Sequence, residues 1–80
     1  MEISQALSLR IREILKERKL SQYKLEQMSG ISHNTMIFLL NNKYKSCNLR
    51  TLVIVIMSLN MTIKEFFDDE LFSNENLEVD

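Results

Sequence analysis

The stretch SGISHNTMIFLLNNK, residues 29–43, holds the only glycine in an 80-residue chain that has no proline. Gly30 follows a predicted helix over residues 22–29, and glycine adopts at little cost the left-handed conformation that often ends a helix. Ser32 is a favourable N-cap for a second helix over residues 33–41. Two short helices joined by about three residues predict a helix-turn-helix in which the polar start of the second helix protrudes.

Hydrophobic residues flank three predicted caps in the same way. One apolar residue precedes each cap and another occupies the fourth helical position, which is the spacing of a hydrophobic staple. A staple fixes the angle at which the chain enters a helix. The staples pair Leu20 with Leu25, Ile31 with Met36, and Met61 with Phe66, around the caps Ser21, Ser32 and Thr62.

Caps, staples and apolar spacing together predict an all-α fold. Ser4 and Asn48 are candidate caps of two further helices, and Glu65 completes a capping box with Thr62. The near absence of glycine and the lack of proline also favour helices with short connections. We predict helices over residues 4–18, 22–29, 33–41, 49–59 and 63–68.

The apolar run LVIVIM, residues 52–57, admits a second interpretation. Its β-branched residues would suit a buried strand. No other segment offers a strand for it to pair with, and a predicted cap stands at each end. We therefore expect a helix that is buried on most sides.

Composition limits the chain to one small domain. Residues 1–68 are expected to form it, and residues 69–80 to be an acidic tail that is frayed or disordered.

No secretory signal or membrane-spanning run is apparent, and the single Cys47 excludes an internal disulfide. We expect a cytoplasmic protein with no metal and no cofactor, because one histidine and one cysteine do not make a zinc site. We also expect no enzyme, since no nucleophile has a plausible base and no phosphate-binding loop is present.

Charge is distributed unevenly along the chain. Residues 1–63 contain nine lysines and arginines against four glutamates, a balance of +5, whereas residues 64–80 contain one lysine against seven acids, a balance of −6. A modestly basic body with an acidic tail is compatible with a polyanionic partner.

The run from Ile11 to Phe67 resembles the lambda-repressor-like helix-turn-helix family, the Cro/CI or XRE type of bacterial and phage regulators. IREILKERKLSQYKLEQMSGISHNTM is similar to the first three helices of that family, and NLRTLVIVIMSLNMTIKEFF to its fourth and fifth. The resemblance implies a compact five-helix domain with the helix-turn-helix at helices 2 and 3. It also implies that the third helix lies in the major groove of double-stranded DNA.

The resemblance implies roles for particular residues. His33, Asn34 and Phe38 occupy base-reading positions, with Ile37 close by, and Gln22 occupies a phosphate-contacting position. Asparagine can pair with adenine, and an apolar ring can pack on a thymine methyl. The expected DNA-binding residues are Gln22, Ser32, His33, Asn34, Thr35, Ile37, Phe38, Asn41, Lys43 and Lys45.

Some positions depart from the family pattern. Leu15 and Leu40 replace an arginine–glutamate pair that members often carry, and Asn42 replaces the glycine that usually ends the third helix. Ile37 and Phe38 place apolar groups on a face that is usually polar. They leave open a second function, a protein-interaction module such as an antitoxin, beside the leading interpretation of a repressor that occupies an operator.

The helix predicted over residues 49–59 has a broad apolar surface. Val53, Ile54 and Met57 widen it, the last two at positions that are usually polar in the family. A patch of this kind on a small monomer marks a partner surface. We expect a two-fold homodimer, whose third helices would lie about 34 Å apart and would require a roughly palindromic operator.

Overall fold

The computed structural model describes residues 1–41 and 48–78. Within these ranges the chain is all-α and contains no named strand. The elements are α1 (Ile3–Arg18), α2 (Gln22–Ser29), α3 (His33–Leu40), α4 (Leu49–Ser58), α5 (Ile63–Phe67) and the 3-10 helix η1 (Glu70–Phe72). The five predicted α-helices and the fold class are thus confirmed; four of the ten helix ends differ from the prediction, each by one residue.

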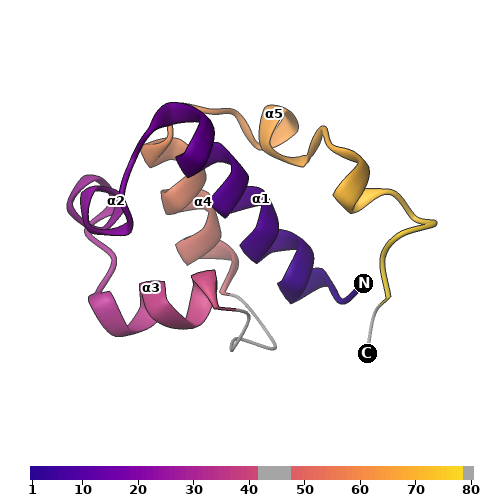
Figure 1. The fold of residues 1–80 in the computed structure, drawn as a ribbon, viewed down its shortest axis with the longest axis horizontal. Helices are drawn as coiled ribbons and strands as arrows, with labels where there is room; N and C mark the ends of the chain where they lie inside the picture. The colour runs from indigo at the N-terminus through magenta and orange to yellow at the C-terminus, as the bar shows by residue number, and fades with distance from the viewer. Residues whose placement is uncertain (42–47, 79–80) are drawn as a thin grey trace.

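Helix α1 crosses the middle of the molecule (Figure 1). Helices α2 and α3 lie toward one side of it, and α5 and η1 lie toward the other. Helix α3 packs on α1 and α2, while α4 packs on α2 and α5. None of the helices in the described ranges combines the length and hydrophobicity that crossing a membrane requires.

Four of the predicted caps start their helices as expected. The side chains of Ser21, Ser32 and Asn48 each accept a hydrogen bond from a backbone N–H in the first turn. Thr62 and its N3 partner form both halves of the capping box. The prediction for Ser4 is wrong: α1 begins one residue earlier, because the Glu2 carbonyl already accepts the N–H of Ala6 at 3.0 Å.

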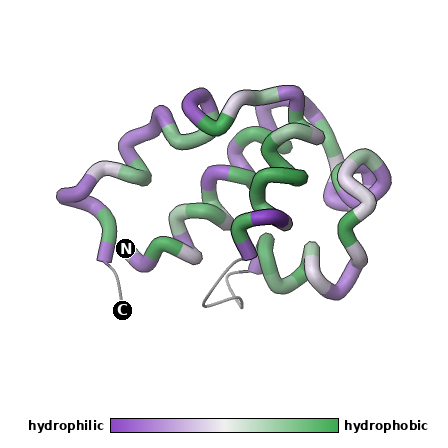
Figure 2. The backbone as a smooth tube through the Cα atoms, turned by 180° about the vertical axis from the view of Figure 1, so that it is seen from behind, coloured by the Kyte–Doolittle hydropathy of each residue, from purple (hydrophilic) through white to green (hydrophobic). Residues whose placement is uncertain are grey.

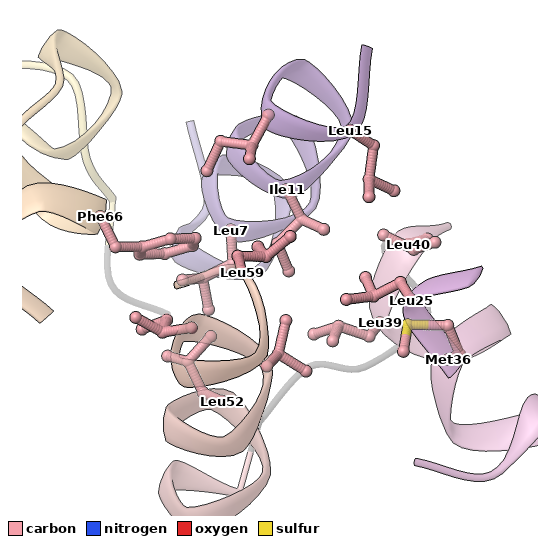
Figure 3. Packing of buried hydrophobic residues seen from close by; sticks show 13 residues of the cluster. Leu7, Ile11, Leu15, Leu25, Met36, Leu39, Leu40, Leu52, Leu59 and Phe66 are labelled. Carbon is pink, nitrogen blue, oxygen red and sulfur yellow. The ribbon is translucent and has the colours of Figure 1, made fainter. Parts of the chain in front are cut away.

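The hydrophobic core draws residues from all five α-helices (Figure 3). The second member of each staple is fully buried, and the first packs against the core from its edge. The run LVIVIM is helical, as predicted, but it is not buried on most sides: Leu52, Val55 and Ile56 are buried on one face, whereas Met57 is 69% exposed. The buried cluster comprises Leu7, Ile11, Ile14, Leu15, Leu25, Met36, Leu39, Leu40, Leu52, Val55, Ile56, Leu59 and Phe66.

The segment after α5 differs from the expected frayed or disordered tail. Asp69 caps η1 by accepting the N–H of Leu71 at 3.0 Å. Phe72 packs against the core, with its ring centroid 4.7 Å from that of Phe67 and 6.0 Å from that of Phe66. Phe72 therefore anchors this segment to the core, which the acid-rich composition did not suggest.

The side chain of Arg10 joins this segment to α1. Its Nε and Nη2 donate to the carbonyls of Phe66 (2.8 Å) and Glu65 (3.1 Å), and its Nη1 lies 3.3 Å from Asp69 Oδ2. The carbonyls at the end of a helix have no partner within it. Arg10 supplies partners for two of them in the five-residue α5, and this ties the end of α5 to α1.

Candidate nucleic-acid interface

The turn between α2 and α3 is built on Gly30, which has φ 72° and ψ 9°. This left-handed geometry lets its N–H donate to the Glu26 carbonyl at 2.9 Å. Ser29 braces the turn, because its hydroxyl donates to the Leu25 carbonyl at 2.7 Å and accepts the N–H of Ile31 at 3.2 Å. The predicted role of the lone glycine is therefore present in the structure.

Helix α3 buries one face and exposes its start. Met36, Leu39 and Leu40 are buried, at the spacing of three and four that one helical face requires. His33 and Asn34 are exposed on the first turn. The corner formed by α2 and α3 stands at the edge of the molecule in Figure 1, and in Figure 2 the tube becomes hydrophilic where α3 begins.

The cap Ser32 serves two groups of the first turn. Its hydroxyl accepts the backbone N–H of Thr35 and donates to the Thr35 hydroxyl at 2.9 Å. The remaining N–H groups at the start of α3 give this end a partial positive charge. An exposed, positively polarised helix start with polar side chains is suited to a negatively charged surface.

A polar cluster links the starts of α2 and α3. Gln22 Nε2 donates to Glu26 Oε2 at 3.1 Å, and His33 Nδ1 lies 2.9 Å and 3.1 Å from the two Glu26 carboxylate oxygens. The hydrogen bond from His33 is the main cause that lowers the pKa of Glu26 below its ordinary value of 4.5. Glu26 was not among the expected site residues, although its position four residues after Gln22 places both on one face of α2.

The end of α3 is held by α1. Ser8 Oγ and Arg12 Nε donate to the Leu40 carbonyl at 2.9 Å and 2.7 Å, and Arg12 Nη2 donates to Asn41 Oδ1 at 2.9 Å. Asn41 also donates to the Ile37 carbonyl at 2.8 Å. Arg12 is a second residue that the sequence did not single out, since its partners lie 28 and 29 positions away.

Apolar side chains continue the outer face of α3. Phe38 is 46% exposed and Ile37 is partly exposed. Leu15 and Leu40, which replace the family's ion pair, are both buried in the core cluster (Figure 3). The remaining expected phosphate contacts, Lys43 and Lys45, lie outside the described residues, as does Asn42.

Helix α4 carries the two most exposed of the large hydrophobic side chains among the described residues. Leu49 is 72% and Met57 69% exposed, and Val53 and Ile54 are partly exposed. Figure 2 shows the hydrophobic character of α4 along nearly its whole length. Leu49 extends the apolar surface that the sequence predicted, because positions 49, 53 and 57 repeat at a spacing of four.

The fold and the corner between α2 and α3 define the class of protein, a helix-turn-helix domain whose second motif helix has an exposed and polar start. Residues 10–71 match the family model described as the Cro/C1-type HTH DNA-binding domain. The chain belongs to this family, which confirms the resemblance seen in its sequence. No match was found among curated proteins, and none among solved structures. Family membership supports DNA binding and a role in the regulation of transcription.

Proposed function

We propose that the protein is a sequence-specific regulator of transcription that represses by occupying an operator in double-stranded DNA. The observation that carries this proposal is the exposed, polar start of α3, positioned by the Gly30 turn. In this arrangement α3 enters the major groove with its first turn against the base edges. The chain would act in the cytoplasm, where bacterial and phage operators are found.

Residues of the corner divide into base readers and phosphate contacts in this proposal. His33 and Asn34 read base edges, and Phe38 with Ile37 packs on thymine methyl groups. Phosphate contacts position the protein without reading sequence. They come from both ends of the motif and from the segment that follows α3, and comprise Gln22, Ser32, Thr35, Asn41, Lys43 and Lys45.

Selection of bound fragments from random DNA, followed by sequencing, tests the base readers. Asn34→Ala is expected to lower the affinity for the selected site by about 1–3 kcal/mol and to relax preference at one position. Lys43→Ala is expected to weaken binding to all DNA sequences alike and to make the affinity less dependent on salt. Asn74→Ala is the matched control, because Asn74 is exposed in the segment after η1, away from α3 (Figure 1). An unchanged sequence preference in Asn34→Ala would refute its role as a base reader.

The same DNA geometry favours a two-fold homodimer through α4. The proposed interface contains Val53, Ile54 and Met57, and Leu49 extends it. A monomer rarely leaves an apolar strip of this kind in water. Two copies related by a two-fold axis would present their α3 helices to successive turns of a roughly palindromic operator.

Mass measurement in solution tests the dimer. Met57→Lys is the cleaner variant, since its side chain is already 69% exposed, and Ile54→Lys probes the partly buried centre of the strip. Each is expected to convert dimer to monomer with the fold retained. Ile63→Lys on α5, where the native side chain is 53% exposed, is the control. A folded Met57→Lys protein that still has the mass of a dimer in solution would refute the proposed interface.

A second function is favoured by the exposure of Phe38. An aromatic ring on the outer face of α3 would also suit a protein partner, as in an antitoxin that holds a toxin. A salt titration of binding to genomic DNA separates the two functions. A DNA-binding protein loses affinity steeply as salt rises, whereas an interaction module would bind DNA weakly at every salt concentration.

A further inference from the structure

The contact between Glu26 and His33 defines which nitrogen of the imidazole faces outward. Both carboxylate oxygens of Glu26 lie within 3.1 Å of His33 Nδ1. An ionised carboxylate can only accept hydrogen bonds. The proton of a neutral His33 ring is therefore held on Nδ1, and Nε2 is left as an acceptor.

The surroundings keep this arrangement in place. The Glu26 side chain is 13% exposed, whereas that of His33 is 66% exposed. Gln22 Nε2 donates to Glu26 Oε2 at 3.1 Å and restrains the carboxylate. Glu26 is ionised at neutral pH, since its ordinary pKa of 4.5 lies well below neutrality and the hydrogen bond from His33 lowers it further. A restrained carboxylate thus orients an exposed ring at the tip of α3.

An acceptor at this tip discriminates among base edges. In the major groove, adenine N6 and cytosine N4 are amino donors, whereas guanine and thymine present acceptors at the corresponding positions. An Nε2 acceptor is attracted by the amino groups and repelled by the carbonyl oxygens O6 and O4. The same ring with its proton on Nε2 would have the opposite preference.

We propose that Glu26 is a specificity-determining positioning residue, which holds His33 in the Nδ1-protonated form so that Nε2 selects adenine or cytosine over guanine or thymine at one operator position. This inference rests on the proposed function, because it assigns the chemistry of one base-reading position. Glu26 does not itself touch the DNA. It acts through the ring of His33.

The first test is carried out on the free protein. His33 is the single histidine of the chain, so correlation of its ring nitrogens and protons by NMR needs no assignment among residues. At pH 8 the wild-type protein is expected to carry the ring proton on Nδ1. Glu26→Ala is expected to lose this bias, while Glu17→Ala, which removes an exposed glutamate of α1, is expected to keep it. A proton on Nε2 in the wild-type protein overturns the inference.

The second test measures sequence preference at the same pH. Wild type is expected to favour adenine or cytosine at one position by about three- to tenfold, the discrimination that one hydrogen bond provides. Glu26→Ala and His33→Ala are both expected to reduce this preference to below about twofold while preserving the preference that depends on Asn34. Loss of a negative charge can raise the affinity of Glu26→Ala for all DNA, but it does not alter the ratio between sequences.

The outcomes separate the two proposals. Wild-type binding with a preference that Glu26→Ala leaves intact overturns the role of Glu26 alone, and the proposed function stands. Absence of DNA binding by the wild-type protein, even at low salt, overturns both. A purely structural contribution of Glu26 would lower stability without changing the preference at that single position, and the comparison with His33→Ala detects this.

Discussion

Replacement of Gly30 by alanine isolates the cost of the turn that separates α2 from α3. Gly30 has φ 72°, and a Cβ added there would meet no atom within 4 Å. Steric overlap with neighbours therefore contributes nothing, and the backbone conformation decides the effect. The left-handed region costs an L-residue about 1–2 kcal/mol. Alanine also restricts the unfolded chain more than glycine does, and this effect stabilises the folded state by about 0.4–1 kcal/mol. We expect a net loss of about 1 kcal/mol in the free energy of unfolding.

Urea unfolding followed by circular dichroism measures this difference. The midpoint should fall with an unchanged slope, and the melting temperature should drop by about 4–8 °C. Gly30→Asn should lose less, because asparagine tolerates the left-handed region. Lys19→Gly is the reciprocal control, since Lys19 ends α1 with φ 55° and an exposed side chain. It should gain stability or remain neutral.

The result that would refute this reasoning is a Gly30→Ala protein as stable as the wild type. Such a result would mean that the turn adopts a negative φ at no cost, and that glycine is not what sets the angle between α2 and α3. Lys19→Gly should not destabilise the protein as much as Gly30→Ala does. If it did, both changes would act through something other than φ, and the argument from the left-handed conformation would be wrong.

Three further expectations concern the packing around the motif. Ser8→Ala removes a buried hydrogen bond to the Leu40 carbonyl and should cost about 1 kcal/mol in denaturant unfolding; a change within error would show that this bond contributes no net stability. Phe66→Ala removes a fully buried ring and should cost about 3–5 kcal/mol, enough to abolish most cooperative unfolding, and a wild-type melting curve would contradict this. Hydrogen bonds from Thr62, the backbone N–H first, lower the pKa of Glu65 below 4.5. Because the folded-state pKa is the lower one, the stabilisation is complete above the ordinary value and is lost as pH falls through the folded-state value. The stability gap between wild type and Glu65→Gln should therefore be present at pH 7 and close in acid; a constant gap would refute the assignment.

Local spacing determined much of the fold. A cap and the N–H groups that it serves lie two or three positions apart, so Ser21, Ser32, Asn48 and Thr62 could be identified without knowledge of the packing. Ser4 failed as a cap because the backbone of Glu2 already accepts the first helical hydrogen bond. The helix-turn-helix layout also predicted that the polar start of α3, with His33 and Asn34, protrudes.

The segment after α5 was harder to interpret. Its composition is dominated by acids, and such segments often stay disordered. The contacts of Phe72 with the core and of Asp69 with Arg10 depend on a surface that α1 and α5 create only after they have packed together. No spacing within the segment itself reveals that surface.

The sequence by itself determined where the helices begin, which faces they bury and where the single left-handed glycine separates two of them, since each of these depends on residues a few positions apart. Tertiary structure alone decided which distant groups meet. Arg10 and Arg12 are charged residues of α1, yet their long side chains reach carbonyls 56 and 28 positions away. Glu26 faces His33 only because the turn sets the angle between α2 and α3. Contacts of this kind depend on how the helices dock, and docking is fixed by the whole core at once.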